Sequence, residues 1–320
     1  LFKRIQKLVK KGRWHIMGGW YLQPDCNMPS GESFVRQILA GKYYFLEKFG
    51  VEPKTVINFD AFGHSRGLVD ILKHAGYDSY IFCRPEPDML DLPAEDFNWV
   101  GFDGSKITCH RAYNSYESHR GEADQKIKGW MEKNRGKSVG LVLWGIGDHG
   151  GGPARAQVDW ILKHRGEWPD VKVVFSHPDA FFAAVRASGV ELPVVTGELQ
   201  HHAIGCYSAL SRIKREVRET EDALRRDGEL LSADVRDDCR AKLYFATFHD
   251  ILGGCSIASA YPDIYDSLGY VRSVCRDARL AQTRRRNAKL PPAKCQRVIF
   301  DNPGKGRWRG VTEFEAWLKS

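Results

Sequence analysis

The sequence TVINFDAFGHS, residues 55–65, joins a short apolar run to a polar loop. Its first five residues are mostly β-branched or aromatic, which predicts a buried strand, and a helical pattern begins near Gly67. Asp60 stands where that strand ends. A carboxylate at such a place must be paired or bound to a metal, because burying a bare charge is costly. Capping the following helix is the alternative interpretation.

Strand and helix patterns alternate on both sides of this segment. Strands are predicted over residues 14–17, 55–59, 79–83, 139–144 and 171–175, and helices over residues 1–12, 33–49, 67–75, 155–163 and 178–187. Repeats at this spacing predict an α/β fold with a parallel sheet or barrel and helices outside it. The active site is then expected in the loops that follow the strands.

The pattern changes after Gly205. Apolar residues recur at helical spacing over residues 210–224, 237–252 and 257–287, which predicts a bundle of helices without strands. The pair Pro291-Pro292 makes a linker, and residues 296–300 look like the first strand of a new domain. Because the sequence opens as if inside a helix, and only about thirty residues follow the linker, we expect the chain to be cut at both ends.

Composition narrows the function. The chain has 320 residues, of which 42% are hydrophobic and 28% charged, which excludes a disordered protein and a small disulfide scaffold. The net charge is +8, but most basic residues alternate with acidic ones, so we predict no nucleic-acid partner. No apolar run approaches the ~20 residues that span a membrane. Eight cysteines occur singly, without a C-x-x-C pair, which predicts reduced thiols and a cytoplasmic location.

Two further loops follow predicted strands. GDHGGGP, residues 147–153, offers Asp148 and His149 beside glycines that let a ligand approach the backbone, although a plain turn is the alternative. ELQHH, residues 198–202, offers His201 and His202, which suit a divalent metal if one faces inward; a surface pair is the alternative.

These residues together indicate a metal-assisted hydrolase of a polar substrate. Two carboxylates that flank a bond are what glycoside hydrolysis requires, one as nucleophile and one as acid/base. Six aromatic residues would suit stacking on sugar faces: Trp20, Tyr21, Phe62, Tyr113, Trp144 and Tyr207.

The sequence resembles the alpha-mannosidases of glycoside hydrolase family 38. The resemblance rests on segments that cover nearly the whole chain in order: GGW at 18–20, PDCNMPSGES at 24–33, DAFGHS at 60–65, FCRP at 82–85, GDHGGGP at 147–153, GELQHHAIGCYS at 197–208 and FHDIL at 248–252. It implies an incomplete seven-stranded β/α barrel over residues 1–205, a three-helix bundle over 206–289, and the start of a β-sandwich domain over 290–320.

The resemblance also implies a retaining mechanism with one zinc ion. Asp60 matches the nucleophile, which also ligates zinc, and Asp148 matches the acid/base, with His149 as the competitor. The zinc-binding histidine matches His201, or His202 beside it. Asp25, Arg84, His149 and Tyr207 match positions expected to face the sugar. His64 is expected to act behind the ligands, and His249-Asp250 to be a buried structural pair.

The departures from the family are as informative as the matches. The family's other two zinc ligands lie in a His-x-Asp motif, and none precedes Asp60 here. Gly253 and Cys255 replace the family's proline and threonine after FHDIL. The resemblance therefore implies part of a bacterial-type zinc enzyme that removes terminal α-linked mannose from oligosaccharides, with this chain alone inactive. A degenerate carbohydrate-binding protein and a metal-dependent deacetylase of polysaccharides are the alternatives, and a homo-oligomer is left open.

Overall fold

The computed structural model of the protein describes residues 1–147, 151–200, 202–292, 294, 297–298, 300, 302 and 306–313. Its strands are β1 Thr55–Asn58, β2 Ser79–Phe82, β3 Asp96–Val100, β4 Lys106–Arg111 and β5 Val194–Val195. Its α-helices are α1 Phe2–Lys10, α2 Gly31–Phe49, α3 Leu68–His74, α4 Ala123–Lys133, α5 Arg155–His164, α6 Pro178–Ala187, α7 Ser211–Asp227, α8 Ala233–Ala246, α9 His249–Leu252 and α10 Tyr261–Asn287. Short 3₁₀ turns η1 Ile204–Tyr207, η2 Gly228–Leu230 and η3 Ala258–Ala260 complete the elements.

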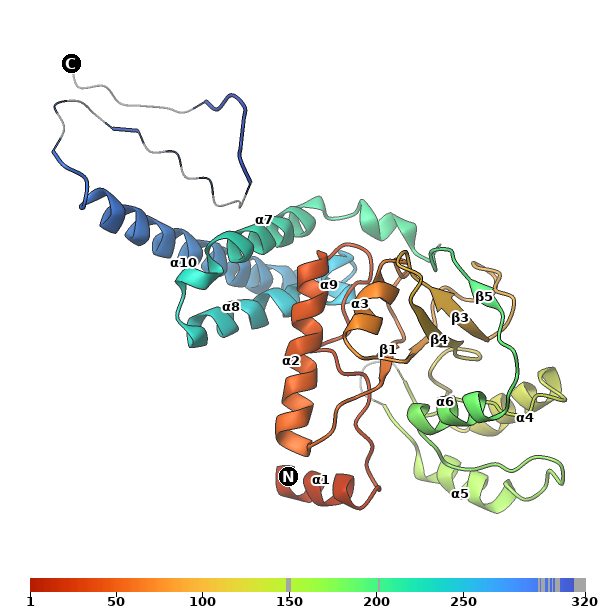
Figure 1. The fold of residues 1–320 in the computed structure, drawn as a ribbon. Helices are drawn as coiled ribbons and strands as arrows, with labels where there is room; N and C mark the ends of the chain where they lie inside the picture. Colours follow the sequence, from red (N-terminus) through yellow and green to blue (C-terminus); the bar gives the residue numbers. More distant parts are fainter. Residues whose placement is uncertain are drawn as a thin grey trace.

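The strands form one mixed sheet in the order β1-β2-β4-β3-β5 (Figure 1). β1, β2 and β4 are parallel, and β3 runs antiparallel to β4. Asn58 pairs with Phe82, and Phe82 pairs with Arg111, so the carboxyl ends of the three parallel strands meet at one edge. The loops that carry Asp60, Arg84 and residues 112–119 all leave the sheet from this edge.

The sheet differs from the predicted alternation. Residues 14–17, 139–144 and 171–175, predicted to be strands, carry no strand in the structure. Val139 and Leu141 pack against the buried cluster around Phe182. Their apolar pattern therefore arises from side-chain packing, and their backbone does not pair with a strand. The β3–β4 hairpin, conversely, was not foreseen. The described part of the chain therefore forms a five-stranded sheet, and the seven-stranded barrel stays a prediction.

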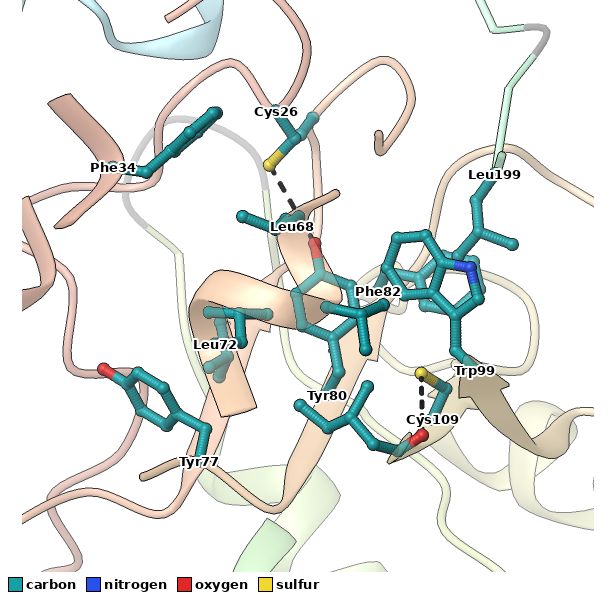
Figure 2. Close-up of a cluster of buried hydrophobic side chains, with 14 of the residues drawn as sticks. Cys26, Phe34, Leu68, Leu72, Tyr77, Tyr80, Phe82, Trp99, Cys109 and Leu199 are labelled. Carbon is teal, nitrogen blue, oxygen red and sulfur yellow. Dashed lines mark hydrogen bonds between the residues drawn. The ribbon is translucent and has the colours of Figure 1, made fainter. Parts of the chain in front are cut away.

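The main hydrophobic core lies against this sheet. Tyr80, Phe82, Trp99 and Leu72 are fully buried there, with Cys26 of the 24–30 loop above them (Figure 2). The Tyr80 hydroxyl lies 3.9 Å from the Cys26 sulfur. Trp20 also belongs to this core, packed against Phe34 of α2, and so is not available for stacking on a sugar.

Helix α2 shows why the predicted helices form where they do. Ser30 caps its first turn by accepting a hydrogen bond from the Ser33 backbone N–H at 3.3 Å, and Gly50 ends it in the left-handed region at φ 68°. Figure 1 shows α2 between the sheet and the long helices α7, α8 and α10.

The three long helices share two buried cores. Ile213, Val217, Leu243 and Leu268 form one of them, and Cys239 and Cys275 lie in the other. The helix predicted over 237–252 is two helices in the structure, because the chain turns at Thr247 and Phe248 between α8 and α9.

The C-terminal part adds little to the described fold. Of the strand predicted over residues 296–300, the described residues 297, 298 and 300 carry no strand, and the rest lie outside the described residues. In the part of the chain that the structure describes, no helix is long and apolar enough to span a membrane.

Candidate functional site

Short backbone bridges bring the predicted loops together. Cys26 pairs with His64, His64 pairs with Leu199, and Pro24 pairs with Phe248 at the start of α9. The backbone N–H of His64 donates to the Leu199 carbonyl at 2.8 Å, and the Leu199 N–H donates back at 3.0 Å. Segments far apart in the sequence, from Pro24 to Phe248, therefore surround the loop that follows β1.

Asp60 is the centre of this region. The Tyr116 hydroxyl donates a hydrogen bond to Asp60 Oδ2 at 3.1 Å, and Arg84 Nε lies 3.0 Å from Oδ1. Oδ1 is itself buried without a hydrogen bond of good geometry. Tyr116 is in turn stacked on Phe59 at the end of β1, with ring centroids 5.5 Å apart. The carboxylate is thus oriented by a cation and a phenol from two neighbouring loops.

Arg84 also contacts His202, one of the two histidines predicted to bind a metal. Its Nη1 lies 3.1 Å from His202 Nε2, and because a guanidinium only donates, Nε2 must be the acceptor. His202 Nδ1 lies 3.0 Å from Glu86 Oε2, and Glu86 Oε1 lies 3.7 Å from Arg84 Nε. The lone pair that His202 would offer a metal is therefore directed at Arg84.

Asp25 is fully buried below these loops. Its Oδ1 accepts hydrogen bonds from the backbone N–H groups of Asn27 at 2.9 Å and Met28 at 2.8 Å, whereas Oδ2 has no partner. Burial raises the pKa of this carboxyl, although His249, Lys214 and the two backbone N–H groups oppose the shift. A buried acceptor without a partner is rare enough to mark a place where a ligand donor can bind.

Tyr207 closes the same side of the region from η1. Its hydroxyl donates to the Phe62 carbonyl at 3.1 Å and receives a hydrogen bond from the Asn27 side-chain amide. The Asn27 side chain is also bonded to Gln200. The Tyr207 hydroxyl thus links the Asp60 loop to the loop of Asp25 through hydrogen bonds to Phe62 and Asn27.

His64 anchors the Asp60 loop from within the core. Its Nδ1 accepts from the Tyr80 hydroxyl at 2.7 Å and its Nε2 donates to the Arg84 carbonyl at 2.8 Å. Burial lowers the pKa of His64 to about 4, so the ring is neutral at physiological pH. Both ring nitrogens of His64 are thus engaged by hydrogen bonds, and its role behind the ligands stays a prediction.

His249 borders the site from the helical part. Its Nδ1 donates to the Gln23 carbonyl at 2.9 Å, which leaves Nε2 as the nitrogen with a lone pair. The ring is buried with its centroid 6.2 Å from that of Phe62. The Asp250 side chain is about half exposed, and its Oδ1 lies 4.0 Å from His249 Nε2. Of the pair predicted to be buried and structural, only His249 is buried.

Three predicted site residues, Asp148, His149 and His201, lie outside the described residues. Among those described, no group of three or more histidine, cysteine, aspartate or glutamate side chains could hold a metal ion. The guanidinium of Arg84 contacts both Asp60 and His202, where a shared cation would have to bind. The described residues alone therefore do not fit a zinc ion.

Sequence patterns missed two members of the site. Tyr116 lies in a loop without periodicity, and Glu86 follows the FCRP segment without any motif of its own. A tyrosine and an acid placed just after two strands that end at one sheet edge were the available signals. Of the aromatics predicted to stack on sugar, Phe62 lies in this region beside Arg84, whereas Tyr113 faces Lys133.

The carboxylate of Asp60, held by an arginine and a tyrosine, lies beyond the carboxyl ends of parallel strands, where open α/β sheets place their ligand sites. Comparisons define the class further. Residues 1–203 match the family described as "Glycosyl hydrolases family 38 N-terminal domain". This chain belongs to that family.

Individual relatives agree with this assignment. The chain is 31% identical over 283 residues to Alpha-mannosidase G of Dictyostelium discoideum, which covers 82% of this chain and 26% of that protein. It is 30% identical over 276 residues to Alpha-mannosidase 2C1 of Homo sapiens, covering 80% and 26% respectively. The crystal structure of an alpha-mannosidase from Enterococcus faecalis V583 has a similar fold, with a TM-score of 0.73 at 21% identity, over 89% of this chain and 35% of that one. This chain thus spans about a quarter of the length of these two curated relatives.

Proposed function

We propose that this chain is part of a longer retaining α-mannosidase that removes terminal α-linked mannose from oligosaccharides. The observation that carries the proposal is Asp60, whose carboxylate lies between Arg84 and Tyr116 at the end of a parallel strand. Family membership and the names of the relatives support mannose as the sugar. The short length relative to those proteins supports a part rather than the whole.

In this proposal Asp60 is the nucleophile. One carboxylate oxygen attacks the anomeric carbon, while an acid, Asp148 or its neighbour His149, protonates the leaving oxygen; water then releases the sugar with the same residue acting as base. Arg84 and Tyr116 keep the carboxylate in one orientation, which favours attack along a single line. Both groups place positive charge or an O–H dipole beside the oxygens of Asp60.

The residues expected to face the sugar are Asp25, Arg84, His149 and Tyr207. Asp25 Oδ2 is suited to accept from a hydroxyl because it is buried and has no other donor. Tyr207 is suited to shape this wall rather than to bind directly, since its hydroxyl already bonds Asn27 and Phe62.

Zinc is proposed from the family alone. Asp60 and His202 or His201 would be its ligands here, and His249 is a further imidazole with a suitable tautomer. Two or three donors leave the coordination of zinc incomplete, because a stable zinc site has four ligands. We therefore expect this chain alone to bind zinc weakly and to be inactive. The single cysteines favour a cytoplasmic protein.

Release of mannose from nitrophenyl α-mannoside tests the proposal. A protein expressed from the reading frame extended upstream of Leu1 and downstream of Ser320 should release mannose only with zinc, and the 320-residue chain should release none. Asp277→Asn, on the exposed face of α10, is the matched control for substitutions of site carboxylates. Zinc-dependent release by the short chain would refute its inactivity, and an extended protein that cleaves other α-glycosides but not mannosides would refute the substrate.

One observation favours a second candidate, a carbohydrate-binding protein without catalysis. Because Arg84 already contacts both Asp60 and His202, the region is compatible with sugar binding in the absence of a metal. The two candidates differ in one result. If the protein only binds sugar, titration should show binding of methyl α-mannoside, but neither the short nor the extended protein should release mannose.

A further inference from the structure

A buried network of hydrogen bonds runs from the sheet to Arg84. Asn58 of β1, Tyr80 of β2 and His64 are each fully buried. The Asn58 side-chain amide donates to the Tyr80 hydroxyl at 3.3 Å, and that hydroxyl lies 2.7 Å from His64 Nδ1. His64 Nε2 lies 2.8 Å from the Arg84 carbonyl oxygen. The network therefore links the interior of the core to the residue that contacts Asp60.

The donors of this network all point toward Arg84. A carbonyl oxygen only accepts, so His64 Nε2 carries the ring proton. Because the ring is neutral at physiological pH, Nδ1 has a lone pair, and the Tyr80 hydroxyl donates to it. The phenol thus selects the tautomer of His64. With the proton on Nδ1 instead, the lone pair of Nε2 would face those of the Arg84 carbonyl.

Tyr80 is a rigid base for the network. Its ring packs beside Phe82 and Trp99, with centroids 6.1 and 6.0 Å away, and Figure 2 shows it among other buried side chains of the main core. The Asn58 amide, which also donates to Cys26 Sγ at 2.9 Å, bonds its hydroxyl. A side chain packed in this way has little freedom to move, so the hydroxyl stays in place.

The position of Arg84 depends on this network. Within the described ranges of the chain, the His64 ring is the one hydrogen-bond donor to the Arg84 carbonyl. The guanidinium of Arg84 has Nε 3.0 Å from Asp60 Oδ1 and Nη1 3.1 Å from His202 Nε2. These contacts join side chains of three loops, and a shift of about 1 Å in the Arg84 backbone would weaken both.

We propose that Tyr80 and His64 are positioning residues for hydrolysis: Tyr80 sets the tautomer of His64, and His64 holds Arg84 against Asp60. The inference rests on the proposed function, in which Asp60 is the nucleophile. Both positioning side chains are fully buried and lie behind the reacting groups. Their loss leaves every reacting group in the protein but misplaces Asp60, which lowers kcat more than it changes KM.

Tyr80→Phe in the 320-residue chain tests the network without any reaction. The variant keeps the buried ring and removes the donor to His64 Nδ1, so the ring proton should move from Nε2 to Nδ1 in part of the molecules. NMR of ¹⁵N-labelled histidine and arginine should show this change and a shift of the Arg84 Nε–H resonance.

Tyr77→Phe is the matched control for this experiment. Tyr77 is buried in the same core, and among the described residues its hydroxyl has no hydrogen-bond partner. Removing that hydroxyl should therefore leave the His64 and Arg84 resonances unchanged. An Arg84 resonance that is also unchanged in Tyr80→Phe would overturn the proposal.

Kinetics of the extended protein test the effect on the reaction. Tyr80→Phe should lower kcat about tenfold with KM within about twofold, and Tyr77→Phe should change neither. His64→Leu should lower kcat about a hundredfold. His64→Gln should keep most of the rate, because its amide N–H can donate to the Arg84 carbonyl in place of Nε2. A folded His64→Leu protein as fast as His64→Gln, or a loss confined to KM, would overturn the positioning role.

The two experiments separate this inference from the proposed function. An extended wild type that releases no mannose refutes the function, and the Arg84 resonance then decides the positioning alone. An active extended protein in which Tyr80→Phe and His64→Leu both keep the wild-type kcat upholds the function and overturns the inference.

Discussion

Glu221 provides a quantitative test of how the helical part holds the site. This carboxylate, on α7, is 7% exposed. Its Oε1 accepts from the Ser30 backbone N–H at 2.8 Å and from the Ser33 hydroxyl at 2.6 Å, and its Oε2 accepts from Arg218 at 2.7 Å. Arg218 also donates to the Met28 carbonyl. One side chain therefore fastens the segment after Asp25 to the helices.

The cost of removing it follows from its partners. Glu221→Ala leaves two donors of Ser30 and Ser33 without an acceptor, and each such loss costs about 1–3 kcal/mol. The pair with Arg218, whose side chain is 55% exposed, adds at most about 1 kcal/mol. We expect the free energy of unfolding to fall by about 2–5 kcal/mol. Glu221→Gln keeps an acceptor oxygen and should lose about 1–2 kcal/mol.

Urea unfolding at pH 7, followed by tryptophan fluorescence and by circular dichroism, measures these changes. Glu219→Ala is the matched control, since Glu219 lies on the same helix, is 54% exposed and only approaches Arg272 at 3.9 Å; it should change stability by less than about 0.5 kcal/mol. A Glu221→Ala protein as stable as the Glu219→Ala protein would refute the reasoning.

Three further predictions concern the core and the site. The His64 ring stays neutral in the folded state down to about pH 4, whereas in the unfolded chain it binds a proton near pH 6.5. The stability that this ring contributes is therefore complete above pH 6.5 and falls by up to roughly 3 kcal/mol as the pH drops to 4. His64→Gln should remove this part of the pH dependence of urea unfolding. Leu72→Ala, at a fully buried position, should cost about 2–5 kcal/mol in the same assay, and a cost below about 1 kcal/mol would show that the core is not packed as described. Tyr116→Phe should lower kcat of the extended enzyme about ten- to a hundredfold with KM nearly unchanged, because it removes a hydrogen bond to the charged nucleophile; a change confined to KM would count against this role.

Local signals in the sequence predicted most of the helices because their causes are local, although α4 was not predicted. Ser30 and Gly50 bound α2 by capping and by a left-handed φ, and both effects depend on a few neighbouring residues. The strands at 55–59 and 79–83 were also found, since apolar β-branched runs favour burial in a sheet.

Pairing between strands depends on partners far along the chain, so periodicity could not predict it. Val139 and Leu141 have the apolar pattern of a strand but bury their side chains against α6 without a hydrogen-bonded neighbour. Trp20 illustrates the same limit for function, because an aromatic suited to a sugar is equally suited to a core, and here it packs on Phe34.

The candidate site was predicted in part. The strand-end rule selected Asp60, and the family resemblance added Arg84; the two lie 3.0 Å apart at one edge of the sheet. The strand-end rule did not single out Tyr116, which reaches Asp60 from a loop where Asn114 and Ser115 both adopt positive φ. Nor could it show that Arg84 meets the lone pair of His202, because that contact joins residues 118 positions apart.

Mannose release by the extended protein, compared between the wild type and Asp60→Asn, tests the central claim most directly. If Asp60 is the nucleophile, the wild type releases mannose and Asp60→Asn loses at least about a thousandfold in rate, while Asp277→Asn retains full activity. An Asp60→Asn protein that releases mannose as fast as the wild type would contradict the account.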